Sequence, residues 1–344
     1  MTPNEEGYFF PAEWHPHRAT WLSFPHNIDT WEDRLPRVYE AYFKFIAELA
    51  SEETVCISSG NDKTKSVIEL GLNQRGIPTQ NIQLFDFKTN DSWCRDHGPS
   101  FVINPSLGEK AIVNWGYNAW GGKYPPFDAD DAIPSKVAKT LNLKLYEPGI
   151  IMEGGSIEVN GDGTLMTSKS CLLNKNRNPH LSQKQIEEKL KLYYNVEQIL
   201  WLEEGIVGDD TDGHVDDMTR FINSDTVLTA LETDRLDDNY SPLRENLELL
   251  KNMKLAGGTK INIETLPMPD PVLDSGLRLP ASYANFYILN NKVIVPTYRC
   301  KKDDEALKII ERCFPDRKIV GIDSTDIIWG LGSFHCLSQQ EPKV

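Results

Sequence analysis

Residues 54–87, TVCISSGNDKTKSVIELGLNQRGIPTQNIQLFDF, carry the pattern of one complete β-α-β unit. Residues 54–58 form a short apolar and β-branched run, which is typical of a strand. Residues 63–75 have helical spacing and stop before Gly76, and residues 82–87 form a second run typical of a strand. This stretch therefore predicts an α/β fold in which short strands alternate with helices.

The rest of the chain repeats this alternation. Residues 292–296 predict a strand, 303–314 a helix and 318–322 another strand, whereas 157–167 and 285–296 have hairpin patterns around Gly161-Asp162-Gly163 and Asn290-Asn291. Further helices are expected over 183–194 and over 242–254, the latter opened by Ser241-Pro242 and closed by Gly257-Gly258. Because no Ser/Gly-rich or Pro-rich linker divides the chain, we expect one closed domain over residues 1–344.

Composition excludes several classes of function. The chain has 40% hydrophobic and 25% charged residues, as soluble globular proteins do, and its net charge of −15 disfavours nucleic-acid and anionic-membrane partners. Its acidic N-terminus is unlike a signal peptide, and no apolar run approaches the roughly 20 residues of a membrane span. The six cysteines contain no C-x-x-C pair, so we expect reduced thiols and a cytoplasmic location.

Three segments combine glycines with charged or reactive residues: Asp91–Pro99, Gly208–Asp217 and Trp329–Pro342. The first alone is equally compatible with a polar turn in which Arg95 and Asp96 form a salt link. The second holds five aspartates and one histidine in ten residues, so a solvated acidic loop and a metal site are both alternatives. An EF-hand is excluded, because with Gly213 as the loop glycine the end ligands fall on Gly208 and Thr219.

The third segment contains the candidate nucleophile, Cys336. Glycines at 330 and 332 would let the backbone approach a ligand closely, and a thiolate with a nearby base is the arrangement of nucleophilic catalysis. In a strand, His335 would point away from its neighbour, so we favour His214 as the base. By the same alternation His214 and Asp216 would share one side of a strand. Cys56, in an apolar run, is interpreted as a buried hydrophobe.

These segments, together with Glu153-Gly-Gly-Ser156, resemble the agmatine deiminase and bacterial-type peptidyl-arginine deiminase family of the guanidine-modifying pentein superfamily. The resemblance covers essentially the whole chain. It implies a five-fold pseudosymmetric α/β propeller of ββαβ-type modules around a central channel that holds the active site. It also includes these segments: Pro11–Trp14, Ala19–Trp21, Phe24–His26, Asn118–Lys123, Asn174–Pro179 and Leu279–Asn285.

The resemblance also implies a role for each matching residue. Cys336 would be the nucleophile, His214 the general acid and base, and Asp96 and Asp216 the carboxylates that grip a guanidinium. Glu153 and Asp210 would lie in the same pocket. Carboxylates on two sides can hold a planar guanidinium and fix its central carbon over a sulfur. We expect the bound guanidinium to offset the negative charge of these carboxylates and so to favour the thiolate form of Cys336. The expected reaction uses no metal and no organic cofactor.

The expected substrate is agmatine, a small cationic guanidine without a carboxylate, which suits a chain of net charge −15. Its products would be N-carbamoylputrescine and ammonia, in putrescine synthesis. Trp93, Trp115 and Glu204 are our candidates for binding the amine end, and Cys94 is interpreted as a bystander. Alternatives are a peptidyl-arginine deiminase, a catalytically silent pentein that serves as a binding module, and a metal hydrolase. A homodimer is implied by the resemblance alone.

Overall fold

The computed structural model describes all residues from 1 to 344. Its strands form five sheets of three or four strands, and one further two-stranded hairpin. The strands are β1 (His17–Ser23), β2 (Thr54–Ser58), β3 (Ile82–Phe85), β4 (Ser100–Asn104), β5 (Glu109–Val113), β6 (Lys144–Tyr146), β7 (Ile157–Val159), β8 (Thr164–Ser168), β9 (Gln198–Leu202), β10 (Thr219–Phe221), β11 (Thr226–Leu231), β12 (Asn262–Pro267), β13 (Leu273–Asp274), β14 (Leu277–Arg278), β15 (Tyr287–Ile288), β16 (Lys292–Thr297), β17 (Lys318–Asp323) and β18 (Ser338–Pro342).

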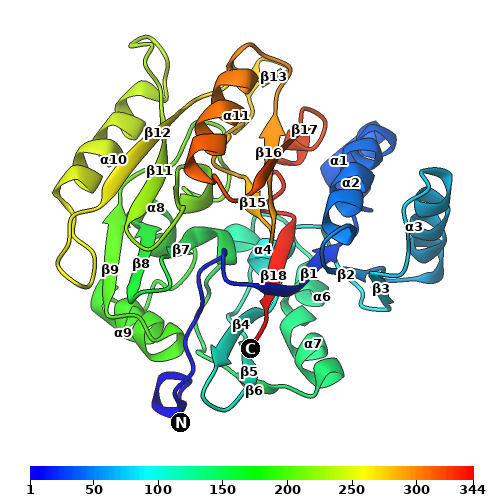
Figure 1. Ribbon diagram of the computed structural model, residues 1–344, viewed down its shortest axis with the longest axis horizontal. Helices are drawn as coiled ribbons and strands as arrows, with labels where there is room; N and C mark the ends of the chain where they lie inside the picture. The colour runs from blue at the N-terminus through cyan, green and yellow to red at the C-terminus, as the bar shows by residue number, and fades with distance from the viewer.

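The helices connect these strands and lie mainly at the rim of the molecule (Figure 1). They are α1 (Ile28–Trp31), α2 (Leu35–Ala50), α3 (Asp62–Gln74), α4 (Cys94–His97), α5 (Ala119–Gly122), α6 (Asp128–Asp131), α7 (Ile133–Leu141), α8 (Lys169–Leu172), α9 (Gln183–Tyr194), α10 (Tyr240–Asn252) and α11 (Lys302–Cys313). Two single-turn 3₁₀ helices, η3 (Gly154–Ser156) and η4 (Val215–Asp217), come shortly before β7 and β10. No helix combines the length and the apolar character that a membrane crossing requires.

Each of the five larger sheets is built on the same plan. An antiparallel pair is followed by a helix and then by a strand parallel to the second member of the pair, as in β7-β8 with β9 after α9. The plan recurs in β4-β5-β6, β10-β11-β12 and β15-β16-β17. It is the ββαβ repeat that the resemblance implied, and the five-unit α/β fold is thereby confirmed.

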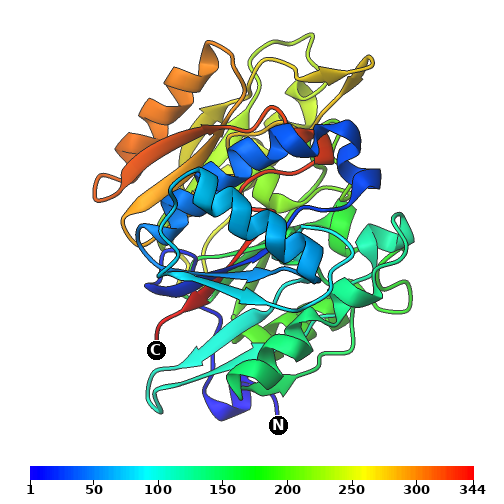
Figure 2. The same ribbon diagram turned by 90° about the vertical axis from the view of Figure 1, so that its right-hand side faces the viewer.

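The fifth unit joins the two ends of the chain. β18 pairs antiparallel with β1, and β1 pairs parallel with β2, so the C-terminal strand takes the place of a first strand (Figure 2). Each unit therefore has a first strand, and these are β4, β7, β10, β15 and β18. The segment before each first strand points to the middle of the molecule, where α4 and β18 lie (Figure 1).

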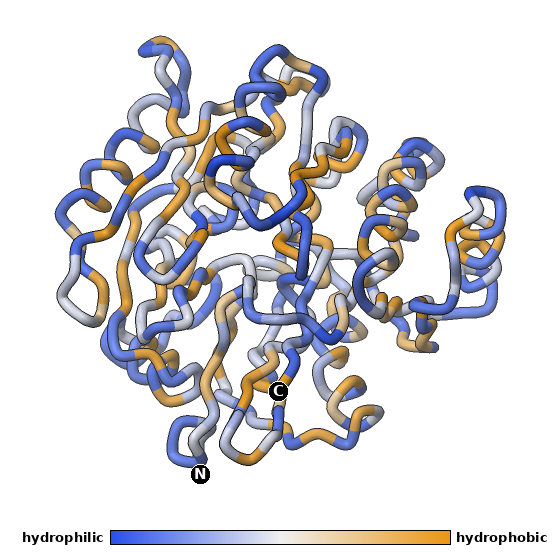
Figure 3. Tube along the Cα trace, viewed as in Figure 1, coloured by the Kyte–Doolittle hydropathy of each residue, from blue (hydrophilic) through white to orange (hydrophobic).

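Amphipathic helices cover the outer faces of the sheets. Along α10 the hydropathy alternates within each turn, and the side chains that it buries are spaced as one helical face (Figure 3). α2 buries Val38, Tyr42, Phe45, Ile46 and Leu49 in the same manner, in an apolar cluster that extends to Cys336. The nucleophile candidate is thus held by a packed core rather than by a surface loop.

Most of the strands and helices expected from the sequence are present, with ends that differ by one or two residues. The helix expected over 242–254 begins earlier, at Tyr240, and ends at Asn252, because Met253 is already extended. Gly257 and Gly258 do not close that helix; they lie in the loop between Lys254 and Lys260, which form a β-bridge. The prediction that His214 and Asp216 lie in a strand is wrong, because residues 215–217 form the 3₁₀ helix η4 and His214 immediately precedes it.

Candidate functional site

A cavity of about 730 Å³ opens at the centre, and Trp93, Asp96, Trp120 and Cys336 line it. This volume is in the range that holds small-molecule ligands. Asp96 and Cys336 line this cavity, and four further polar side chains are buried beside them. We call these six side chains the cavity floor, and they come from the segments that precede the five first strands. They are Asp96 from α4, Glu153 beside η3, His214 and Asp216 around η4, Asn285 before β15, and Cys336 before β18.

Gly155 marks the point where three of these segments meet. A Cβ atom placed on Gly155 would lie 2.7 Å from Nδ1 of His214, 2.8 Å from Oδ1 of Asp96 and 3.0 Å from Oδ2 of Asp216. Only a residue without a side chain leaves room for all three groups. The Glu153-Gly-Gly-Ser156 segment is therefore part of the site as well as a turn, because its glycine lets the carboxylates and the imidazole converge.

Asp96 is buried and held from two sides. Its Oδ2 accepts a hydrogen bond from Nε1 of Trp120 at 2.9 Å, and its Oδ1 accepts one from the backbone N–H of Gly155 at 2.9 Å. Burial raises the pKa of Asp96 to about 6; the nearby His214 opposes that rise, whereas Asp216 and Glu153 add to it. Arg95, which we considered as a salt-link partner of Asp96, pairs instead with Glu13 at 3.3 Å.

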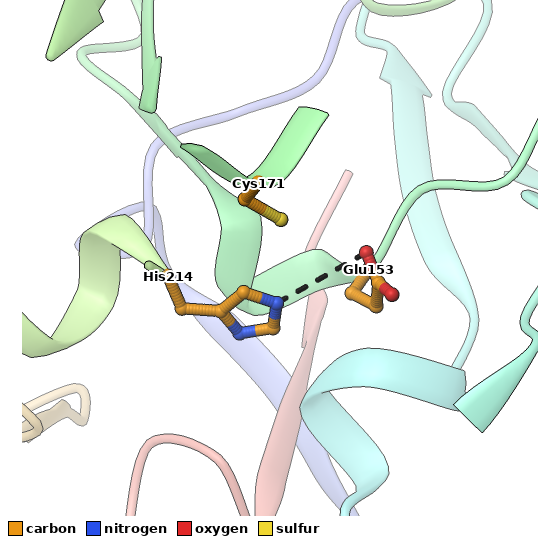
Figure 4. A group of neighbouring side chains, drawn as sticks. All are labelled: Glu153, Cys171 and His214. Atoms are coloured by element: carbon orange, nitrogen blue, oxygen red, sulfur yellow. Dashed lines mark ion pairs between the residues drawn. The ribbon is translucent and has the colours of Figure 1, made fainter. Parts of the chain in front are cut away.

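His214 is fully buried, and neither ring nitrogen makes a hydrogen bond. Its Nδ1 lies 3.7 Å from Oδ1 of Asp96, and its Nε2 lies 4.0 Å from Oε2 of Glu153. Figure 4 shows the imidazole pointing toward Glu153, with Cys171 beside both. Burial alone would lower the pKa of His214, but Asp96, Cys171 and Glu153 outweigh it and raise that pKa well above the usual value. A histidine in this state can give a proton to a departing group.

The Sγ atom of Cys336 lies 3.5 Å from Oδ2 of Asp216 and 3.0 Å from Nδ2 of Asn285. Burial raises the pKa of this thiol well above its usual value, and Asp216, Asp217 and Asp96 add to that effect. The free protein therefore favours the thiol over the thiolate at neutral pH. Asn285 supplies a donor beside the sulfur, a contribution that our sequence interpretation did not assign.

The two oxygens of Asp216, which is fully buried, differ in their partners. Oδ2 accepts a hydrogen bond from Nδ1 of His335 at 2.6 Å, whereas Oδ1 is buried and has no partner. We expected His335 to point away from the side of Cys336, and this was wrong. Residues 334–337 form a turn rather than a strand, so both side chains approach the same oxygen of Asp216.

Glu153 is fully buried next to His214, and it is not among the side chains that line the cavity. Its Oε1 accepts a hydrogen bond from Nε of Arg177 at 2.6 Å, and its Oε2 has no hydrogen-bond partner. Asp210, by contrast, lines the cavity and is partly exposed. It pairs with Nζ of Lys123 at 3.1 Å and accepts a hydrogen bond from the hydroxyl of Tyr124. Asp210 is therefore available to the outer end of a ligand and not to the group beside Cys336.

Protein groups compensate the five aspartates of residues 208–217. Asp209 accepts hydrogen bonds from the backbone N–H groups of Thr211, Gly213 and His214, at 2.7 to 3.1 Å, and thus shapes the loop that presents the histidine. Lys123 and Arg177 both pair with Asp212, Lys123 with Asp210, His335 with Asp216, and Asn285 with Asp217. The solvated acidic loop that we considered is therefore not what forms, since most of these carboxylates are held.

Trp93 lines the cavity, as expected for a substrate contact, and its ring lies 5.5 Å from that of Trp31. The glycines at 330 and 332 pack against Trp93, since a Cβ on either would come within 2.8 Å of its ring. We expected these glycines to let the backbone approach a ligand, but the group that packs closely against both of them is the indole ring of Trp93.

Three other side chains lie outside the cavity lining. Trp115 is buried near Tyr193 and Tyr194, and Glu204 is exposed, so neither supports our candidate role at the amine end. Cys94 is buried in an apolar cluster, and burial raises its pKa to about 12. This location agrees with its interpretation as a bystander.

Comparisons with known proteins identify the family of this chain. The model of the Porphyromonas-type peptidyl-arginine deiminase family matches residues 9–342. The agmatine deiminase of Pseudomonas aeruginosa (strain LESB58) is 36% identical over 367 residues, which cover 99% of this chain and 97% of that protein. The solved agmatine deiminase of Enterococcus faecalis superposes with a TM-score of 0.92 at 34% identity, over 99% of this chain and 98% of the other.

A solved C. jejuni agmatine deiminase with substrate bound is likewise 34% identical, with a TM-score of 0.87 over 97% of this chain and 96% of that one. Such likeness extends over the whole length, including every segment that contributes a side chain to the cavity floor. The chain belongs to the Porphyromonas-type peptidyl-arginine deiminase family.

Proposed function

We propose that this protein is an agmatine deiminase, which hydrolyses agmatine to N-carbamoylputrescine and ammonia. The observation that carries the proposal is a set of unsatisfied groups in neighbouring side chains: Oδ1 of Asp216, both ring nitrogens of His214 and Oε2 of Glu153 are buried without partners. Buried polar atoms are rarely left unpaired, so this set predicts a polar ligand. A guanidinium offers several N–H donors in one plane and satisfies carboxylates on two sides.

The reaction would proceed through a covalent intermediate. When the guanidinium binds, the thiol of Cys336 loses its proton to solvent, and the thiolate Sγ attacks the central guanidinium carbon, which Asp96 and Asp216 hold in place, to form a tetrahedral adduct. His214 gives its proton to the departing nitrogen, which leaves as ammonia, and an amidino-cysteine remains. The neutral His214 then takes a proton from water, whose oxygen attacks the same carbon. Collapse of this second adduct breaks the C–S bond and releases the ureido product. The hydroxyl proton of the adduct passes to the sulfur, and His214 keeps the proton that it took from water.

The cavity lining favours agmatine over substrates that carry a carboxylate. It contains no arginine, and its single lysine, Lys123, is already paired with Asp210 and Asp212. Its acidic residues are six aspartates: Asp29, Asp91, Asp96, Asp130, Asp210 and Asp274. Burial raises the pKa of Asp130 to about 8, so this side chain is mainly neutral at pH 7. The other aspartates give the lining a negative charge, which attracts the second positive charge of agmatine and repels the carboxylate of free arginine. Trp93 and Asp210 are the residues that we propose for contact with the part of agmatine remote from Cys336.

The test is ammonia release from purified protein given agmatine, arginine and a blocked arginyl peptide in parallel. Turnover of agmatine alone, lost in Cys336→Ala and unchanged by a chelator, is the expected result. Turnover of the peptide would instead assign a peptidyl-arginine deiminase. Loss of activity with chelator would support a metal hydrolase. If none of the three substrates releases ammonia, the result would favour a catalytically silent binding module.

The remaining expectations are proposals of the same kind. We propose a single catalytic domain, because the first and last strands pair and close the ring of units. We also propose that the enzyme acts without metal or organic cofactor, that it serves putrescine synthesis in the cytoplasm, and that it has no nucleic-acid or membrane partner. A homodimer is proposed from the family resemblance, and sedimentation analysis of the purified protein tests it.

A further inference from the structure

Behind the cavity floor, two buried residues that the proposed reaction does not use lie in line with Asp216. The ring of His335 is 1% exposed, with Nδ1 2.6 Å from Oδ2 of Asp216 and Nε2 2.7 Å from Oε2 of Glu13. A neutral imidazole has one N–H and could donate to only one of these oxygens. Because both ring nitrogens face carboxylate oxygens, both must donate if both carboxylates are ionised.

The surroundings of Glu13 show that it is ionised. Nη2 of Arg220 lies 3.0 Å from its Oε2 and Nη2 of Arg95 lies 3.3 Å away, while the backbone N–H of Ile288 donates to its Oε1 at 2.8 Å. Burial would raise the pKa of Glu13, but Arg220, His335 and Arg95 more than offset it and hold that pKa well below the usual value. This carboxylate is therefore fixed at both oxygens.

Asp216 is ionised as well. Burial opposes ionisation, but the hydrogen bond from His335 and the positive charges nearby lower the pKa of Asp216. Its Oδ2 is thereby committed to His335 and to the thiol of Cys336, which leaves Oδ1 unpartnered. Without His335, the carboxylate could turn about its terminal torsion and neither oxygen would have a fixed direction.

The geometry points to His335 as a positioning residue that, as an imidazolium clamped by Glu13, holds Asp216 ionised with Oδ1 directed at the substrate guanidinium. Glu13 affects Asp216 only indirectly, because it contacts the imidazole ring of His335 and not Asp216 itself. This inference rests on the proposed function for the identity of the guanidinium, but not for the clamp itself. Several charged and titratable groups face the clamp: Arg95, Arg220, Glu158 beyond Arg220, His214 and Asp217 beside Asp216, and the Cys336 thiol.

The alternation of charge explains why such a cluster is tolerated in the core. From Arg220 through Glu13 and His335 to Asp216, each ion lies within 3.0 Å of one of opposite sign. Buried ions are stable only when paired and hydrogen-bonded, and the removal of one member leaves its neighbour uncompensated. A guanidinium bound at Oδ1 of Asp216 would extend the same alternation into the cavity.

The first measurement needs no variant. In the wild-type protein at neutral pH, ¹⁵N NMR of His335, assigned by comparison with His335→Gln, should show both ring nitrogens protonated. A neutral ring would overturn the inference. If His335→Gln does not fold, Glu13→Gln provides the assignment instead. This variant removes the carboxylate next to Nε2 of His335 and should therefore shift the ring-nitrogen signals of His335. Because this readout does not involve agmatine, it stands even if the proposed function fails.

The second measurement is a double-mutant cycle on kcat/KM for agmatine. His335→Gln should lower kcat/KM by about 100-fold, since a neutral amide cannot serve both carboxylates. Asp216→Asn should lower it more, and the double variant should be no worse than Asp216→Asn alone, because His335 acts through Asp216. A purely structural role would instead give losses that multiply.

The control for Glu13 is Glu158, which also pairs with Arg220, at 2.9 Å, but does not touch His335. Glu13→Gln should lower kcat/KM by about 10-fold, whereas Glu158→Gln should remain within threefold of the wild type. Equal losses in the two variants would assign the effect to Arg220 and overturn the inference. A wild-type enzyme that releases no ammonia from agmatine would contradict the proposed function and leave the NMR measurement to decide on the clamp.

Discussion

The side-chain amide of Asn285 holds Cys336 at two points. Its Nδ2 donates toward Sγ over 3.0 Å, and its Oδ1 accepts hydrogen bonds from the backbone N–H groups of Cys336, at 3.3 Å, and of His335, at 3.1 Å. One planar group thus fixes both the backbone and the sulfur of the nucleophile. Three aspartates near Cys336 disfavour the thiolate, whereas a hydrogen bond from the backbone of Ser333 favours it, and the Asn285 amide is a second donor at the sulfur.

Asn285→Asp keeps the acceptor that orients the backbone but replaces the donor with a further negative charge. We expect kcat/KM for agmatine to fall by about 100-fold, because the thiolate loses its hydrogen bond and gains a repelling neighbour. Inactivation by iodoacetamide, followed as a function of pH, should require a higher pH than in the wild type. Cys336→Ala identifies the alkylated residue by mass spectrometry, and an unchanged pH dependence would show that Asn285 has no effect on the thiol.

A bound guanidinium should lower the pKa of Cys336. Burial and the surrounding carboxylates raise the pKa of the free thiol well above its usual value, and a cation held against Asp96 and Asp216 would offset the carboxylates. The absorbance of the thiolate near 240 nm should therefore increase at neutral pH when an unreactive alkylguanidine is added, and Cys336→Ala should not respond. A thiol pKa that is the same with and without the guanidine would contradict substrate-assisted activation.

The sequence allowed the repeating units to be predicted well where local signals are strong. Helix α9 has the expected bounds, because Ser182 and Gln185 form a capping box at its start and Asn195 adopts a left-handed conformation at its end. The carboxylates, the histidine and the thiol of the cavity floor were found through the family resemblance. The structure shows why residues so far apart in the chain meet: each precedes the first strand of a unit.

The errors occur where an irregular backbone replaces the expected strand. Alternation placed His335 and Cys336 on opposite faces, but a turn before β18 directs both to Asp216. Periodicity cannot describe a turn, and it cannot show that Glu13 pairs with a residue more than 300 positions away. Asn285 stood in a segment that the resemblance included. Each of the other four units supplies a site side chain from the segment before its first strand. A comparison of the five segments with one another would therefore have singled out Asn285.

The pH dependence of kcat/KM should follow Asp96. The pKa of this carboxyl is raised to about 6, so the group is ionised above that pH and becomes neutral as the pH falls through it. Only the ionised form pairs with a guanidinium, and kcat/KM, which reports the free enzyme, should therefore decline below about pH 6. The bound cation favours the ionised form, so the decline of kcat should lie at lower pH. Steady-state ammonia release between pH 5 and 8 checks this, and a flat kcat/KM profile would contradict it.

Gly155→Ala should disable the enzyme without unfolding it. The added Cβ would lie within 3.0 Å of His214, Asp96 and Asp216, and at least one of these groups must move away from the substrate position. Displacements of about 1 Å at a reacting centre cost on the order of 100-fold in rate, so we expect kcat to fall by at least that factor. The matched control is Gly257→Ala, since a Cβ there meets no atom within 4 Å and the backbone is not left-handed. Circular dichroism and thermal unfolding of both variants separate a local displacement from a loss of fold. An active Gly155→Ala enzyme would show that the three groups need not converge as closely as they do here.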